Sequence, residues 1–158
     1  MDERMADDVA DRSDWYADGL HFTCAQCGNC CTGPPGYVWF TDDEAARMAE
    51  FLEMSVDAFR RQYAHRIFHR WTLNEREVDG QYDCVFLIRD QQGRAGCSVY
   101  AVRPTQCRTW PFWPENLATP ENYVRLARRC PGVKNGLEGE GTCYPIEQIR
   151  TRRDQTRG

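Results

Sequence analysis

The sequence lacks several features that would assign it to a common class. It has no run of ~18 apolar residues, the length that a membrane-spanning helix needs. The N-terminus has no basic stretch followed by an apolar segment, so no signal peptide is recognisable. The formal net charge of -4 leaves no basic excess, which argues against a general nucleic-acid-binding protein. We therefore expect a soluble, cytoplasmic protein that binds neither membranes nor nucleic acid.

Signatures of catalysis are also absent. We find no paired acid and base, no nucleotide-binding loop and no nucleophile in a triad-like setting. His65 and His69 stand four apart, but Arg66 follows His65 where a hydrolytic zinc motif has glutamate, so both are interpreted as surface or helix-end histidines. His21, three residues before Cys24, is a candidate extra metal ligand. Whether the chain is an enzyme stays open, and a binding module is favoured over an enzyme or electron carrier.

The composition is that of a folded chain. Hydrophobic residues make up 41% and charged residues 28% of the 158 residues, a length that suits one domain. No internal repeat or low-complexity linker divides the sequence. We predict an acidic tail over residues 1–18, one domain over 19–150 and a basic tail over 151–158, with both tails solvated.

Local patterns predict an α+β fold made of short pieces. Thr41 and Glu44 form a capping box before a helix over 42–54, and Ser55 caps a second helix over 56–68. A β-hairpin is predicted within 83–102, its first strand beginning at Cys84 and its second carrying Cys97. Short helices are predicted over three further segments, namely 103–110, 119–130 and 144–153. Such small elements need something to hold them together.

Cysteine is what the sequence has in excess. The chain has nine cysteines, and four of them fall within "CAQCGNCC". An odd number cannot pair completely, and thiols in a reducing compartment bind metal more often than they form disulfides, although a secreted, disulfide-linked domain is the alternative. Cys24, Cys27 and Cys30 have the spacing with which a tight turn points sulfurs at one ion, and Gly28 permits the positive φ that such turns need. Adjacent Cys30 and Cys31 could serve two neighbouring metal sites.

The identity of the metal stays open at this point. The first three cysteines copy a bacterial ferredoxin run, but Pro34 and Pro35 stand where the fourth cysteine and its proline should follow. A cysteine elsewhere could complete a [4Fe–4S] cluster, and eight thiolates could equally build two tetrahedral zinc sites. Arginines near the later cysteines would offset the negative charge of metal thiolates, namely Arg94, Arg103, Arg108, Arg128 and Arg129.

Four stretches in order carry a family resemblance: "FTCAQCGNCC", "CVFL", "GCSVYAVRPTQCRTWPF" and "RRCPGV". Together they resemble the YkgJ-type cysteine-cluster family, the CxxCxxCC zinc- or iron-chelating domain. The resemblance implies eight cysteine ligands for zinc or iron, namely Cys24, Cys27, Cys30, Cys31, Cys84, Cys97, Cys107 and Cys130. Cys143 falls outside the pattern and is expected to be dispensable.

The sequence therefore predicts a small α+β domain organised around cysteine-ligated metal. Its function would be zinc or iron chelation in a structural or interaction module, with the metal ion as ligand and a protein as a candidate partner. The alternative is an iron–sulfur protein with a redox or enzymatic role, because the resemblance extends to the cysteine cluster of flagellin lysine methylases.

Overall fold

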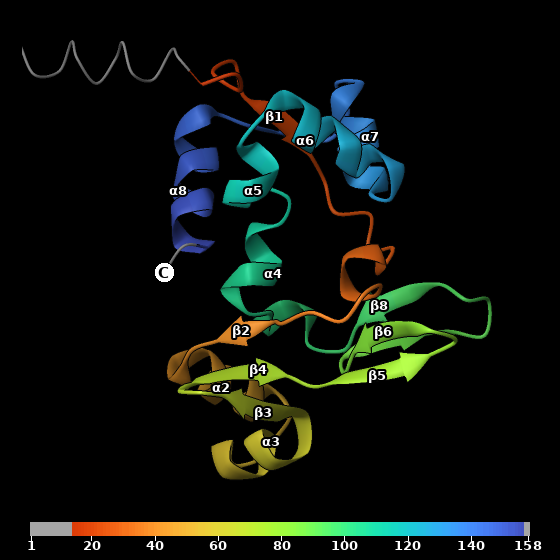
Figure 1. Ribbon diagram of the computed structural model, residues 1–158, viewed down its shortest axis with the longest axis vertical. Helices are drawn as coiled ribbons and strands as arrows, with labels where there is room; N and C mark the ends of the chain where they lie inside the picture. Colours follow the sequence, from red (N-terminus) through yellow and green to blue (C-terminus); the bar gives the residue numbers. More distant parts are fainter. Residues whose placement is uncertain (1–13, 157–158) are drawn as a thin grey trace, which may run out of the picture. The chain divides into compact units, whose positions relative to one another are not determined.

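The computed structural model describes residues 14–156 (Figure 1). The chain divides into two compact units. The terminal unit comprises the described parts of Met1–Ala25 and Pro111–Gly158, and the central unit comprises Gln26–Trp110. Most of the acidic tail predicted for residues 1–18 lies outside the described residues.

Two helices of the central unit begin at the caps that the sequence predicts. Helix α2, Asp42–Phe51, starts at Thr41, whose hydroxyl accepts from the backbone N–H of Glu44 while the Glu44 carboxylate accepts from the N–H of Thr41. Helix α3, Val56–Tyr63, starts at Ser55, which caps the N–H of Ala58. Both capping predictions are confirmed.

The predicted second helix is too long. It ends at Tyr63, and Ala64–Ile67 form strand β3, which pairs antiparallel with β4, Arg70–Leu73. Strand β2, Trp39–Phe40, completes a three-stranded sheet in the order β2-β4-β3. Pairing with β4 buries the side chain of Ala64 and outweighs the helical pattern of the sequence. His65 and His69 therefore do not share a helix face.

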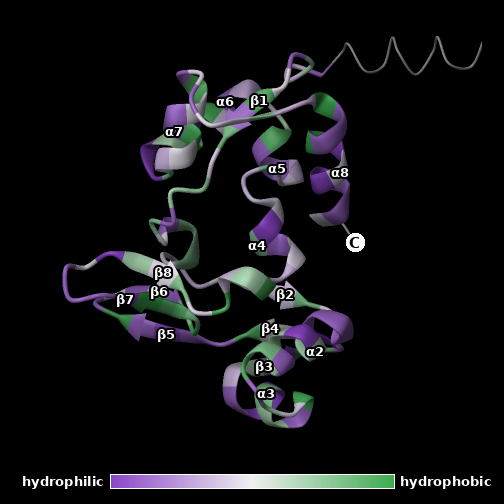
Figure 2. Cartoon of the chain, turned by 180° about the vertical axis from the view of Figure 1, so that it is seen from behind, coloured by the Kyte–Doolittle hydropathy of each residue, from purple (hydrophilic) through white to green (hydrophobic). Residues whose placement is uncertain are grey.

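Two more hairpins follow in the central unit. Strands β5, Glu75–Val78, and β6, Gln81–Cys84, form the first, and β5 is mostly hydrophilic (Figure 2). The second pairs β7, Leu87–Arg89, with β8, Ala95–Cys97, which confirms the predicted hairpin and the place of Cys97 on it. The start predicted for this hairpin is wrong, because Cys84 ends β6 instead of beginning β7.

The core of the central unit lies where α2 and α3 cover the three-stranded sheet (Figure 1). The Phe59 ring packs against those of Phe40, Tyr63 and Phe86 with centroids at most 6.2 Å apart, and the Tyr63 and Phe86 rings are 4.9 Å apart. Cys84 and Cys97 pack against the edge of this core. Three short elements complete the unit: the 3-10 helices η1, Asn29–Cys31, and η2, Tyr100–Val102, and helix α4, Thr105–Thr109.

The terminal unit joins the two ends of the described chain. Strand β1, Leu20–Phe22, pairs antiparallel with β9, Thr142–Tyr144. The helices of this unit are α5, Pro114–Leu117; α6, Pro120–Arg125; η3, Leu126–Arg128; α7, Pro131–Leu137; and α8, Ile146–Thr156. The single helix predicted over 119–130 is thus wrong in its second half, because it gives way to η3 and a new helix starts at Pro131. Mixed helices and small antiparallel sheets confirm the α+β class.

The ends of the described chain pack within the terminal unit. The Tyr16 ring is buried, and Asp14 accepts from Arg150 of α8 at 2.7 Å. Arg153 of α8 donates to the Tyr16 hydroxyl at 2.8 Å. The domain boundaries predicted from the sequence stay a prediction.

Candidate metal centre

The two units divide the nine cysteines, none of which forms a disulfide. The terminal unit contains Cys24, Cys130 and Cys143. The central unit contains the other six, namely Cys27, Cys30, Cys31, Cys84, Cys97 and Cys107. The structure therefore sorts the eight cysteines predicted as ligands into a pair and a group of six.

Five thiols of the central unit lie close enough to influence one another electrostatically. We call them the thiol cluster: Cys30, Cys31, Cys84, Cys97 and Cys107. The sulfurs of Cys30 and Cys31 are 3.8 Å apart. Ionised Cys84, Cys30 and Cys97 would each raise the pKa of Cys107. The fold thus brings thiols separated by more than seventy positions in the sequence near one another.

Gly28 places the first two members of the cluster. Its φ of 76° lies in the left-handed region, and it caps η1, which carries Cys30 and Cys31. A Cβ at position 28 would lie 2.5 Å from the Cβ of Ala95 in β8. Only glycine lets η1 approach the β7–β8 hairpin this closely. Cys27 precedes Gly28 in the same loop and is half-buried.

Cys84 and Cys97 sit in two turns of the same design. Each sulfur accepts a hydrogen bond from the backbone N–H two residues later, that of Phe86 for Cys84 and that of Val99 for Cys97. These bonds favour the thiolate, but burial outweighs them and raises the pKa of Cys84 to about 11 and that of Cys97 above its ordinary value. N–H donors aimed at a sulfur are what a thiolate metal ligand requires.

Helix α4 supplies Cys107 and is anchored from outside the cluster. The backbone N–H and the hydroxyl of Thr105 both donate to Glu44 of α2, the former over 2.8 Å. Gln106 accepts from the N–H of Trp39 and donates to the carbonyl of Tyr37. Cys107, the next residue, is therefore held by an anchored helix. Burial is the main reason that the pKa of its thiol is raised.

The charges of two arginines act on the cluster. Arg103 lowers the pKa of both Cys97 and Cys107, and Arg76 lowers that of Cys84. The guanidinium carbon of Arg103 lies 3.8 Å from the centre of the Tyr100 ring, and its Nε donates to the Tyr100 carbonyl. Of the other arginines of this unit predicted to serve the cysteines, Arg94 bonds Asp90 and Arg108 lies 3.7 Å from the carboxylate of Glu44.

The thiols of the cluster resist ionisation, because burial and the charges of neighbouring thiolates both raise their pKa. The bond to Cys30 raises the pKa of Cys31 most, followed by burial and by the charges of Cys30, Cys107 and Cys84. These thiols can lose their protons together only when a bound cation replaces the protons. Soft thiolates in this number suit zinc or iron. Within residues 14–156, no three His, Cys, Asp or Glu side chains already converge with the geometry of a metal site.

The remaining predicted ligands belong to the terminal unit. Cys24 is half-buried shortly after β1, and Cys130 is buried directly before α7. A Cβ on Gly132 of α7 would lie 2.5 Å from the carbonyl oxygen of Thr23, so the segments that lead to the two cysteines pack closely. Cys143 is exposed on β9, opposite His21 of β1.

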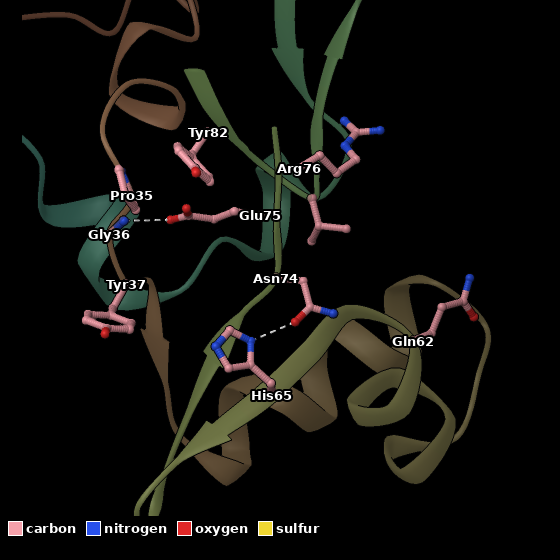
Figure 3. A pocket seen from close by; sticks show the side chains of 10 residues that line it. Pro35, Gly36, Tyr37, Gln62, His65, Asn74, Glu75, Arg76 and Tyr82 are labelled. Atoms are coloured by element: carbon pink, nitrogen blue, oxygen red, sulfur yellow. Dashed lines mark hydrogen bonds between the residues drawn. The ribbon is translucent and has the colours of Figure 1, made fainter. Parts of the chain in front are cut away.

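The central unit also contains a pocket of about 600 Å³ that the sequence does not predict (Figure 3). Nδ1 of His65 lies 2.7 Å from the Asn74 side-chain oxygen, and Glu75 accepts from the N–H of Gly36 at 3.0 Å. No cysteine lines this pocket, whose walls are Pro35, Gly36, Tyr37, Gln62, His65, Asn74, Glu75, Arg76, Tyr82 and Val85. The sequence carries no signal for it, because its walls come from segments that only the fold brings together.

A family model described as "CxxCxxCC: Putative zinc- or iron-chelating domain" matches residues 23–131. The chain belongs to this family. It is also similar to a protein of Methanocaldococcus jannaschii named "Uncharacterized protein MJ0661", with 32% identity over 99 residues. The match covers 63% of this chain and 49% of that protein, so the chain spans about half the length of this curated relative. No solved structure matches the chain.

Membership of the CxxCxxCC family confirms the resemblance seen in the sequence. It supports chelation of zinc or iron without distinguishing between the two metals. Among residues 14–156, no helix combines the length and apolar character needed to cross a bilayer.

Proposed function

We propose that the chain binds zinc or iron through thiolates and that the central unit supplies the main site. The thiol cluster and the neighbouring Cys27 are the proposed ligands of this site. The repeated N–H···S turns of Cys84 and Cys97, next to three further thiols, carry this proposal. Cys24 and Cys130 stay predicted ligands of the terminal unit.

Each part of the central unit has a task in this proposal. The N–H groups of Phe86 and Val99 orient two sulfurs and stabilise their ionised forms. Arg103 offsets the charge that accumulates as thiols become thiolates. When bound, the metal supplies a positive charge that several sulfurs share.

We propose a structural role for this site. The ligands come from η1 and the loop before it, the ends of β6 and β8, and α4, all of which are short elements. A shared metal would cross-link them, and its binding free energy would become folding free energy. Reduced thiols are required, so we expect the protein to act in a reducing compartment such as the cytoplasm.

An iron–sulfur cluster with a redox or enzymatic role is the second candidate. Its support is the donor set, since a [4Fe–4S] cluster takes four cysteine thiolates, as a tetrahedral zinc ion does, and the central unit contains six cysteines. A colour test separates the two candidates. Protein purified without oxygen should be colourless and contain zinc in the first case, or brown with iron and acid-labile sulfide in the second.

Removal of the metal tests the structural role. Chelation under reducing conditions should lower the midpoint of thermal unfolding, and addition of zinc or iron should restore it. An identical unfolding midpoint with and without bound metal would refute the structural role while leaving metal binding intact. A protein that carries no metal after anaerobic purification, and that takes up neither zinc nor ferrous iron, would refute the proposed function itself.

A further inference from the structure

The tip of the β3–β4 hairpin displays a phenylalanine where the backbone disfavours one. Ile67 pairs with Arg70, so Phe68 and His69 form a two-residue loop. Phe68 has a φ of 54° and its side chain is 93% exposed. A bulky residue in the left-handed region is an outlier, and a fully solvated ring contributes nothing to the core.

A second two-residue hairpin loop of the same unit also has a positive φ at its first position, but it carries there a residue type that tolerates this φ. Val78 pairs with Gln81, so Asp79 and Gly80 form the two-residue loop between β5 and β6. The φ angles of Asp79 and Gly80 are 51° and 79°. Asp-Gly is preferred where both loop residues have positive φ, and glycine is preferred at the first position where, as in the Phe68–His69 loop, only the first residue does. Phe68 occupies the position that corresponds to Asp79, so its retention costs folding free energy and calls for a role outside the fold.

The chain around Phe68 has an unusual charge. Residues 58–74 contain four arginines and two histidines and no aspartate or glutamate, in a protein of net charge -4. The guanidinium carbon of Arg70 lies 4.3 Å from the Trp39 ring centre, and that of Arg66 lies 5.7 Å from the Trp71 ring centre. Stacking holds both groups in place while their side chains stay exposed.

Neither guanidinium forms an ion pair within residues 14–156. Arg60, which also lies over Trp71, is by contrast paired with Asp42. Stacked arginines with open donor edges suit bidentate contacts with carboxylates. The tip therefore presents one apolar ring between two fixed cations.

We propose that this tip is a docking site for a protein partner with an acidic surface. Phe68 would enter an apolar pocket of the partner, and Arg66 and Arg70 would pair with carboxylates on its rim. Binding interfaces commonly concentrate their energy in one aromatic anchor with arginine beside it. The apolar area of the tip is a single ring, which fits a pocket better than a bilayer, whose binding strength scales with buried apolar area.

The substitution Phe68→Gly tests this proposal without threatening the fold. Glycine accepts the positive φ, so the variant should keep the thermal stability of the wild type. Asp79→Gly is the control, because it also introduces glycine at the first, positive-φ position of a two-residue hairpin loop. A double variant, Arg66→Gln with Arg70→Gln, removes the cations alone.

The probe is a random-peptide library selected on the full chain. We expect selected peptides to combine apolar residues with aspartate or glutamate. Synthesised peptides should bind Phe68→Gly at least about tenfold more weakly than the wild type. They should bind the double arginine variant more weakly and with less dependence on salt. Their affinity for Asp79→Gly should equal that for the wild type. The proposal is overturned if selection gives no acidic peptides or if the peptides bind Phe68→Gly as well as the wild type. It is equally overturned if anionic phosphatidylglycerol vesicles or single-stranded oligonucleotides, rather than peptides, show the dependence on Phe68.

Discussion

The backbone N–H of Thr105 donates to the buried carboxylate of Glu44 over 2.8 Å, and this bond ties the helix that carries Cys107 to the core of the central unit. Burial alone would raise the pKa of Glu44. The bonds from Thr105 and Thr41 and the charge of Arg108 outweigh it and hold the pKa below its ordinary value.

Glu44→Ala should therefore destabilise the protein by about 1–3 kcal/mol, because it leaves the donors of Thr105 and Thr41 without their acceptor. Glu44→Gln, which keeps an acceptor oxygen, should cost less, and Asp43→Ala on the exposed side of the same turn is the control. Chemical unfolding of the three variants measures these differences. Equal losses in Glu44→Ala and Asp43→Ala would show that the Thr105 bond does not matter.

The same carboxylate predicts a pH dependence. Its folded-state pKa lies below the unfolded value of about 4.3. Its stabilisation is therefore fully present above that unfolded value and is lost as the pH falls through the folded-state pKa. The stability difference between wild type and Glu44→Gln should shrink in acid. A difference that grows as the pH falls would contradict this assignment.

Gly28 should be the glycine of the central unit least tolerant of a side chain. Gly28→Ala adds a clash with Ala95 to the strain of a positive φ, and we expect a loss of about 2–5 kcal/mol. Gly93 has a similar φ of 79° with no heavy atom within 4 Å of an added Cβ, so Gly93→Ala should lose only the strain, about 1–2 kcal/mol. Denaturant unfolding compares the two, and equal losses would mean that η1 does not pack on β8 as described.

Arg103 should set the pH at which the site releases metal. Arg103→Gln removes the charge that lowers the pKa of Cys97 and Cys107, so protons compete better for the sulfurs. The midpoint of metal release should move to higher pH. Arg94→Gln, which loses only an exposed bond to Asp90, should leave the midpoint in place. A pH titration of bound metal distinguishes the two, and a shift to lower pH in Arg103→Gln would contradict the role of its charge.

Local signals in the sequence predicted local structure well. Thr41 and Ser55 cap their helices because a cap depends only on residues within one turn. The strand at Ala64–Ile67 could not be separated from the end of α3 in this way, because its partner strand β4 decides its conformation. Two overlooked signals were available: Asp79–Gly80 marks the β5–β6 hairpin, and Pro131 marks the start of α7.

The candidate metal site could likewise be predicted from the sequence only in part. Spacing and family resemblance identified the cysteines, but they could not show which of them meet. Cys107 raises the pKa of Cys31 because the fold of the central unit brings the two thiols near each other. Phe68 gave no recognisable signal, since a phenylalanine in a predicted helix is expected to be buried, and only the turn geometry shows that it is not.

The metal content of two single variants tests the central claim most directly. Cys107→Ser removes a thiol from the cluster, whereas Cys143→Ser changes an exposed thiol on β9 that lies outside the predicted ligand set. After anaerobic expression and purification, elemental analysis should find less than the wild-type metal content in Cys107→Ser and the full wild-type content in Cys143→Ser. Full metal content in Cys107→Ser, or the loss of a metal equivalent in Cys143→Ser, would contradict the assignment of the thiol cluster as the metal site.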